Sequence, residues 1–187
     1  MIKKLNDFDK TIYVCGFMAS GKSTFGKALA KELGCDFIDL DKVIEKKEGK
    51  SIREIFRENG ESYFRKIEFE CLGALLRGFK GGVVALGGGA LLNQEVVDNL
   101  KKYGLLVFVD TPMEVIVERV HKSEERPILF DDNGKIKSKE TLFTELKTLY
   151  LKRAKLYKQA QITIKTPLFT SIQEMTKAAI DKITRHV

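Results

Sequence analysis

The chain has 187 residues and a net charge of +7, from 33 Lys and Arg against 26 Asp and Glu. Apolar residues make up 43% and charged residues 32% of the sequence, which is typical of a folded domain and excludes an intrinsically disordered chain. The length suits a single domain over residues 1–187. No run of about 18 apolar residues is present to span a bilayer. The positive excess leaves two partner classes, nucleic acids and small anions.

The cysteine pattern indicates a reducing compartment. Cys15, Cys35 and Cys71 lie among apolar residues and have no CxxC spacing, so they predict neither a disulfide framework nor a zinc site. The two histidines are far apart in the sequence. The apolar stretch over residues 12–19 is short and runs directly into Gly-Lys-Ser, which is unlike a signal peptide. We therefore expect a cytoplasmic protein.

Short apolar runs alternate with helical patterns along the chain, which is typical of a parallel sheet covered by helices. A buried strand over Thr11–Cys15 precedes a helix over residues 22–33, which Gly34 ends. Residues 37–39 form a second short strand. Three further strands are predicted, at residues 83–86, 105–109 and 162–164. Five strands with intervening helices predict one compact α/β domain.

Several helices have recognisable first residues. Ser51–Glu54 is a capping box that opens a short helix, and Gly60 is expected to end it. A long helix is predicted over residues 61–79. Thr111–Glu114 places a proline at the first helical position, and Ser171–Glu174 is a capping box for the last helix.

The loop after the first strand has the pattern of a phosphate cradle. Gly16–Ser23 matches G-x-x-x-x-G-K-[ST], between a buried strand and a helix. Glycines let backbone N–H groups turn inward around phosphate oxygens, and the helix N-terminus adds a positive dipole end. Lys22 is expected to reach the β- and γ-phosphates, and the Ser23 hydroxyl to ligate Mg²⁺. The alternative is a glycine-rich turn with an exposed lysine.

Two carboxylates close the second strand. Asp39 and Asp41 are two residues apart, so in an extended segment their side chains share one face beyond the strand's carboxyl end, where ligands bind in open α/β sheets. One carboxylate suits the Mg²⁺ shell, and the other suits an acceptor hydroxyl that must be oriented or deprotonated. The alternative for Asp41 is that it caps a helix starting at Lys42.

Three further features belong to this search for a site. Gly87, Gly88 and Gly89 end a buried strand, and backbone without side chains allows a ligand to approach closely. Asp110 follows another strand and is a rival Mg²⁺ carboxylate, although it is also explained by the helix start beside it. Residues 122–140 are polar and weakly periodic, which is typical of an active-site lid or a disordered loop.

The motifs together resemble the shikimate kinase family over most of the chain. Those that carry the resemblance are Gly16–Thr24, Asp39–Asp41, Ser51–Phe56, Gly60–Glu61, Phe64–Glu68, Leu86–Ala90, Arg126–Leu129 and Lys152–Tyr157. Their combination is much more specific than the phosphate loop alone. The resemblance implies a three-layer α/β/α P-loop kinase fold with a five-stranded parallel sheet. It also implies a substrate-binding helical segment at about residues 39–68 and a lid at about residues 122–140.

The implied activity is transfer of the ATP γ-phosphate to the 3-hydroxyl of shikimate, in the pathway to aromatic amino acids. The family uses Mg²⁺ as cofactor and ATP as co-substrate. By the resemblance, Asp41 holds the shikimate hydroxyls and acts as the base, while Arg65 and Arg153 hold the carboxylate. Gly87, Gly88 and Gly89 complete the shikimate site, with Gly88 contacting the substrate through its backbone. We expect a monomer that binds neither nucleic acid nor membrane.

The implied nucleotide site lies around the phosphate loop. Its ATP-binding residues are Gly16, Ala19, Ser20, Gly21, Lys22, Ser23, Thr24, Arg119 and Arg126. Lys22 and Arg126 are catalytic, with Arg126 reaching from the lid over the phosphates, and Arg119 lies where the family stacks on adenine. Ser23 ligates the metal, and Asp39 orders it through water. Two departures stand out: Ala19 replaces a common glycine, and residues 165–168 lack the arginine or similar polar residue that is often placed against adenine.

Two of the arginines have alternative predicted roles, and the protein has alternative predicted functions. Arg65 and Arg153 each have charged neighbours and could lie on solvated helix faces. A P-loop kinase acting on gluconate is the nearest rival enzyme. A basic nucleic-acid-binding ATPase is the rival from another class, but the chain has no Lys/Arg stripe interleaved with aromatic residues.

Overall fold

A computed structural model describes residues 10–91, 93–123, 127–131, 133–166 and 171–186. Its centre is a parallel sheet of five strands in the order β2-β3-β1-β4-β5. The strands are β1 (Thr11–Cys15), β2 (Phe37–Asp39), β3 (Val83–Ala85), β4 (Gly104–Asp110) and β5 (Ile162–Lys165). The five predicted strands are therefore confirmed, with bounds that differ by one residue at most.

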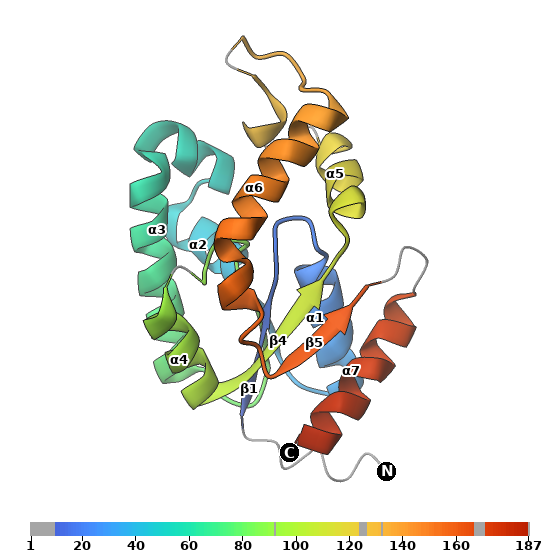
Figure 1. The fold of residues 1–187 in the computed structure, drawn as a ribbon. Coiled ribbons are helices and arrows are strands. Elements are labelled where there is room, and N and C mark those ends of the chain that lie inside the picture. The colour runs from blue at the N-terminus through green and yellow to red at the C-terminus, as the bar shows by residue number, and fades with distance from the viewer. Residues whose placement is uncertain (1–9, 92, 124–126, 132, 167–170, 187) are drawn as a thin grey trace.

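Helices cover both faces of the sheet. They are α1 (Lys22–Leu33), α2 (Leu40–Glu48), α3 (Ile52–Gly78), α4 (Gln94–Tyr103), α5 (Met113–His121), α6 (Lys139–Tyr157) and α7 (Ile172–His186). Figure 1 shows α1 and α7 together on one side of the sheet, with α3, α4 and α6 on the other. The arrangement is the three-layer α/β/α fold that the resemblance implied.

The three central strands, β3, β1 and β4, are buried on both faces, and each face contributes to a separate apolar core. Along β1, Tyr13 and Cys15 join the core under α3, α4 and α6, whereas Ile12 and Val14 join the core under α1 and α7. A strand buried on both sides reads as a continuous apolar run, which is why β1 was predictable. Burial raises the pKa of the Cys15 thiol to about 12, and Cys15, like the other two cysteines, is free.

Helix α3 contains a kink at the glycine that was predicted to end a helix. The Ser51 hydroxyl accepts a hydrogen bond from the Glu54 N–H, and the Glu54 carboxylate accepts one from the Ser51 N–H, so the capping box is confirmed. Gly60 has φ 79° and ψ 173°, which are not helical values, and the chain then resumes its helix to Gly78. One prediction at a helix start is wrong: Pro112 is the N-cap residue, and α5 begins at Met113.

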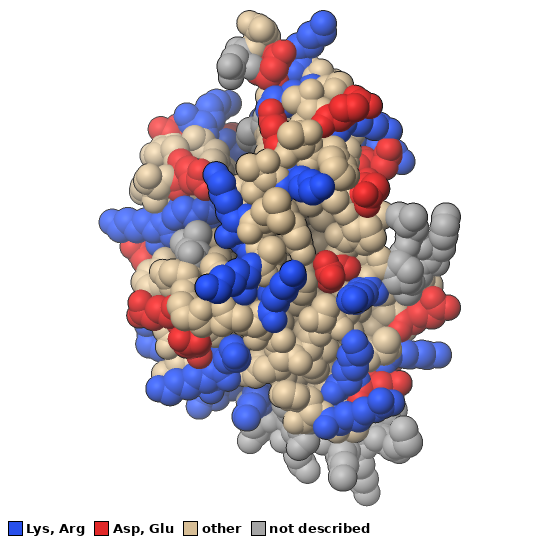
Figure 2. All heavy atoms as spheres, viewed as in Figure 1, with Lys and Arg blue, Asp and Glu red and all other residues tan. Residues whose placement is uncertain are grey.

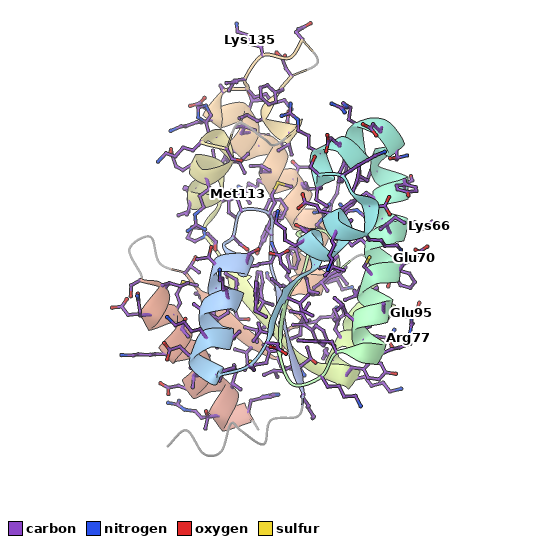
Figure 3. The ribbon with its side chains drawn as sticks, turned by 180° about the vertical axis from the view of Figure 1, so that it is seen from behind. Lys66, Glu70, Arg77, Glu95, Met113 and Lys135 are labelled. Atoms are coloured by element: carbon purple, nitrogen blue, oxygen red, sulfur yellow. The ribbon has the colours of Figure 1, made fainter. Side chains whose placement is uncertain are left out.

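The described residues between α5 and α6 project beyond the body of the molecule, with Lys135 near the tip (Figure 3). Its described part contains a short 3₁₀ helix, Pro127–Leu129, and an antiparallel bridge between Phe130 and Ile136. The Asp131 carboxylate accepts the Lys135 N–H at 2.8 Å, which closes the turn. Because α6 begins at Lys139, the last two residues of the predicted lid are helical.

Charge is mixed over the face of the molecule drawn in Figure 2, where Lys and Arg side chains lie among Asp and Glu side chains over α3 and α6. On α3, Lys66, Glu70 and Arg77 lie along the outer side of the helix (Figure 3). Across the described residues, no helix combines the length and apolar character needed to cross a membrane.

Candidate active site

A cleft of about 580 Å³ lies at the carboxyl ends of the parallel strands, where open α/β sheets bind ligands. Its lining comes from the phosphate loop, the start of α2, the end of β3 and the helices that follow β4 and β5. The lining residues are Met18, Ala19, Ser20, Gly21, Lys22, Ser23, Thr24, Asp41, Leu86, Gly88, Arg119, Ser123, Thr166, Ile172 and Met175.

The phosphate loop closes tightly on itself after β1. The Ser20 N–H donates to the Phe17 carbonyl at 3.2 Å, and Lys22 Nζ donates to the same oxygen at 3.0 Å. Gly16 must be glycine, because a Cβ there would lie 2.7 Å from the Val109 carbonyl oxygen and φ is +150°. The lysine is thereby held along the loop at the mouth of α1, where a helix N-terminus favours anions.

Ala19 is the one described non-glycine residue with positive φ, at 57°. An alanine pays a steric cost in this left-handed region that glycine does not. Arg119 on α5 donates from Nη1 to the Ala19 carbonyl at 2.9 Å. The arginine expected at the adenine thus lies beside the loop and binds its backbone.

The two aspartates occupy different elements, which corrects the expectation of one extended segment. Asp39 ends β2 and is the N-cap of α2, where its Oδ1 accepts the Asp41 N–H at 3.0 Å. Asp41 lies in the first helical turn and lines the cleft. The alternative that Asp41 caps a helix starting at Lys42 is also wrong, since the cap is Asp39 and α2 starts at Leu40.

Two of the three consecutive glycines leave space that charged side chains fill. A Cβ on Gly87 would lie 2.3 Å from Glu68 Oε1 and 3.0 Å from Asp41 Oδ1. On Gly89 it would lie 2.5 Å from Arg65 Nη1. Glycine at these positions therefore allows the Asp41, Glu68 and Arg65 side chains to gather against backbone.

Arg65 is held by two carboxylates on its own helix. Its Nη1 donates to Glu68 at 2.6 Å and its Nη2 to Glu61 at 3.1 Å. Burial alone would lower the pKa of Arg65, but Glu68 and Glu61 raise it above its ordinary value. The guanidinium also lies 5.1 Å from the centre of the Phe64 ring. The alternative of a solvated surface arginine is excluded by this setting.

Glu68 is almost fully buried, at 2% exposed, and its Oε1 has no hydrogen-bond partner among the described residues. Burial raises the pKa of this carboxyl, Arg65 opposes the rise, and Asp41 adds to it. A buried carboxylate with one oxygen unpaired costs folding free energy unless a donor reaches it. That oxygen faces the space at Gly87, beside Asp41.

Helix α6 reaches the same place from the other side. Arg153 Nη1 and the Tyr157 hydroxyl both donate to the Gly88 carbonyl, at 3.2 and 2.6 Å. The two side chains are one helical turn apart and so share a face. Burial raises the pKa of Tyr157 to about 12, and its ring stacks on Phe108 at 5.4 Å. Gly88 is therefore fixed between the cleft and α6.

The structure brings together nearly all of the predicted site residues. Some of them lie just outside the lining: Arg153 binds the Gly88 carbonyl, Gly87 packs against Asp41, and Gly89 packs against Arg65. Arg126 lies outside the described residues. Sequence reasoning gave no role to several residues that now lie at the site. These are Glu68, Tyr157, Thr111 and Thr166. For Glu68, the spacing of three from Arg65 on a helix was a usable signal.

The donor set suits a magnesium ion held mainly by nucleotide phosphates. Among the described residues, no group of three His, Cys, Asp or Glu side chains is placed to hold a metal. Mg²⁺ keeps several waters and takes one or two protein oxygens in such sites. Ser23 lines the cleft together with Asp41, and Asp39 adjoins Asp41. The rival carboxylate, Asp110, is not part of the cleft lining.

Comparisons with known proteins agree on one family. The family model described as shikimate kinase matches residues 18–183. The shikimate kinase of Persephonella marina is 46% identical over 84% of this chain and 89% of its own length. That of Aquifex aeolicus is 43% identical over 82% of this chain and 85% of its own.

Solved structures show the same relationship. Shikimate kinase from Acinetobacter baumannii in complex with shikimate is 32% identical and superposes with a TM-score of 0.86, over 100% of this chain and 98% of that one. A gluconokinase from Sinorhizobium meliloti, 22% identical with a TM-score of 0.58 over 96% of this chain and 94% of that one, shares the fold. The chain belongs to the shikimate kinase family.

Proposed function

We propose that this chain transfers the γ-phosphate of ATP to the 3-hydroxyl of shikimate, giving shikimate 3-phosphate and ADP. Its family membership and the likeness to an enzyme solved with shikimate support the proposal. The observation that carries it is the junction at Gly88. This residue lines the cleft of the phosphate loop, and its carbonyl is held by Arg153 of the acceptor pocket. In the proposed function, the phosphoryl donor and the small anionic acceptor meet at this residue.

The phosphate loop binds the donor. Backbone N–H groups of residues 16–24 and the N-terminus of α1 surround the phosphates, and Lys22 offsets their charge. Arg119, which lines the cleft and binds the Ala19 carbonyl, is proposed to stack on the adenine. Positioning and electrostatic stabilisation supply most of the catalysis in phosphoryl transfer, so a rigid cradle is the main requirement.

The acceptor pocket matches the chemistry of shikimate, a small carboxylate with vicinal hydroxyls. Arg65 and Arg153 bind the carboxylate, because guanidinium groups make charge-assisted, bidentate hydrogen bonds to it. Asp41 accepts from the hydroxyls, orients the one that attacks and takes its proton. The backbone of Gly87, Gly88 and Gly89 lets the ring approach closely.

Mg²⁺ would be held by the Ser23 hydroxyl and, through water, by Asp39. When bound it offsets charge on the phosphate oxygens. Residues 122–140 act as the lid, which excludes water that would compete as phosphate acceptor. By the same proposal, Arg126, which lies outside the described residues, would contact the phosphates. We further expect a cytoplasmic monomer that binds no nucleic acid, and sedimentation at rising protein concentration checks its oligomeric state.

A coupled assay of ADP release tests the function. The protein is given ATP and Mg²⁺ with shikimate, with gluconate, with a nucleoside monophosphate, or with no acceptor. We expect turnover with shikimate that exceeds the acceptor-free rate by several orders of magnitude, and little with the other acceptors. Turnover that requires gluconate instead of shikimate would reassign the chain to the rival kinase, and ADP release without any acceptor would point to an ATPase.

A further inference from the structure

Two buried threonine hydroxyls connect the phosphate loop to the far end of the cleft. Thr111 follows β4 and Thr166 follows β5, and they are 6% and 8% exposed. Thr111 Oγ1 donates to the Ser20 carbonyl at 3.0 Å, and Thr166 Oγ1 donates to Thr111 Oγ1 at 2.9 Å. The two hydroxyls therefore form one short chain that ends on the loop backbone.

The direction of these two hydrogen bonds is fixed by which atoms can donate and which can only accept. A carbonyl oxygen only accepts, so the single hydrogen of Thr111 is committed to Ser20. Thr111 Oγ1 can then only accept from Thr166, whose alternative acceptor, the Asp110 carbonyl, is more distant at 3.3 Å. That carbonyl already receives the Thr166 N–H at 2.8 Å. Removing either hydroxyl leaves a buried polar atom without its partner.

These two hydrogen bonds set the orientation of one peptide group in the phosphate loop. In a trans peptide the C=O of one residue and the N–H of the next point in opposite directions, and no described peptide bond is cis. Because Thr111 holds the Ser20 carbonyl, the Gly21 N–H is turned away from Thr111. Gly21 lines the cleft and has φ 94°, a value that glycine adopts without the steric cost of a Cβ, so no side chain at this position helps to fix the peptide. The buried hydrogen bond from Thr111 to the Ser20 carbonyl fixes it instead.

Thr166, at the other end of this pair of hydrogen bonds, lies in the opposite part of the same cleft. Thr166 lines the cleft together with Ile172 and Met175, away from the acceptor side marked by Asp41 and Gly88. Thr166 is also fixed to β4 through its backbone N–H. The strand end that borders the far part of the nucleotide cleft is thus tied by side chains to the loop that takes the phosphates.

We propose that Thr111 and Thr166 are positioning residues for the nucleotide, which set the Ser20–Gly21 peptide so that the Gly21 N–H meets a phosphate oxygen. The proposal rests on the proposed function, because it assumes that this cleft binds ATP. It makes the strength of nucleotide binding depend on two hydroxyls that need not touch the nucleotide themselves. The acceptor site, which uses neither hydroxyl, is unaffected.

The test replaces each hydroxyl with a methyl group of similar volume. Thr111→Val should raise the KM for ATP and the Kd for ADP by about five- to tenfold, and lower kcat, with the KM for shikimate unchanged. Thr111→Ser should restore wild-type values. Thr166→Val should have a smaller effect, and should add little in the Thr111→Val background, because both act through one chain.

A matched control is available at the other end of the sheet. Thr11 is 2% exposed, and its hydroxyl also donates to a backbone carbonyl, that of Phe79 at 3.2 Å. Thr11→Val should lower thermal stability without changing the Kd for ADP. If Thr111→Val does not fold, Thr166→Val, which keeps the bond to Ser20, carries the test.

Three results would overturn the proposal: an unchanged Kd for ADP in Thr111→Val or, if that variant does not fold, in Thr166→Val; equal rises of KM for ATP and shikimate; or failure of Thr111→Ser to restore the Kd. ADP binding is measured by titration without any acceptor. A wild-type protein that binds ADP but does not phosphorylate shikimate would contradict the proposed function and leave the positioning role intact.

Discussion

The two halves of the cleft are constructed differently. On the donor side, the phosphate loop is held by hydrogen bonds to its carbonyl oxygens, from Lys22, Arg119 and Thr111. On the acceptor side, charged side chains hold one another, as Arg65 does with Glu68. The donor side therefore depends on backbone conformation, and the acceptor side on the balance of charge.

The difference suits the two ligands of the proposed function. Phosphate oxygens are met by many N–H groups at once, and a loop with fixed peptide planes provides them without side-chain entropy. A small carboxylate with hydroxyls needs a few charged groups at defined positions, and these must be paired while no substrate is bound. Substitutions on the acceptor side should therefore change the kinetic constants for shikimate and leave those for ATP unchanged.

The largest effect is expected for Asp41→Asn. The amide keeps the size of the side chain but cannot take the proton of the attacking hydroxyl, so kcat should fall by about 10²- to 10⁴-fold. Binding of ATP should be nearly unchanged, because Asp41 belongs to the acceptor side. Steady-state kinetics and nucleotide titration check this, and near-normal turnover would remove Asp41 from its role.

Arg65→Lys should weaken shikimate more than ATP. Lysine keeps the charge beside Glu68, so a buried carboxylate is not left alone, but it loses the two-pronged contact with the substrate carboxylate. We expect the KM for shikimate to rise by about 10- to 100-fold and the KM for ATP to stay the same. A rise in both constants would show that the two halves are not independent.

Gly89→Ala tests the same arginine through the backbone. The added Cβ would lie 2.5 and 2.6 Å from the two terminal nitrogens of Arg65, which must shift. Because that end of the side chain is flexible, the fold should persist while the KM for shikimate rises by about tenfold. Gly78→Ala is the matched control, since a Cβ there meets nothing within 4 Å. Equal kinetics in the two variants would contradict the packing of Arg65 against Gly89.

The smallest effect concerns stability. Tyr157→Phe removes the hydroxyl that donates to Gly88, and should lower the free energy of unfolding by about 1 kcal/mol at neutral pH. Folding raises the pKa of Tyr157 from 10.0 to about 12, so the protonated hydroxyl is favoured in the fold. Its contribution is complete below pH 10 and is lost as the pH rises through about 12.

Denaturant titrations of wild type and Tyr157→Phe at neutral and alkaline pH check this. The difference between the two proteins should shrink as the pH rises above 10. A difference that grows with pH would mean that the ionised form is favoured in the fold, against the burial of this group.

Particular residues show which features of the fold and the site could be predicted from the sequence. The strands were predictable because burial on both faces leaves a continuous apolar run, as in β1, and the phosphate loop because its spacing is tied to its chemistry. Asp41 was misplaced, since whether a residue continues a strand or enters the following helix depends on the turn between them, and Asp41 lies in the first turn of α2. Thr111 was assigned only to a helix start, because its partner Ser20 is 91 residues away and no local pattern predicts that contact.

The product itself tests the central claim most directly. The protein is incubated with ATP, Mg²⁺ and shikimate, and the product is analysed by ³¹P and ¹H NMR. We predict one phosphate ester, on the 3-hydroxyl, formed in equal amount to ADP. A phosphate on another hydroxyl would contradict the placement of the acceptor against Asp41, and ADP with inorganic phosphate alone would contradict the kinase activity.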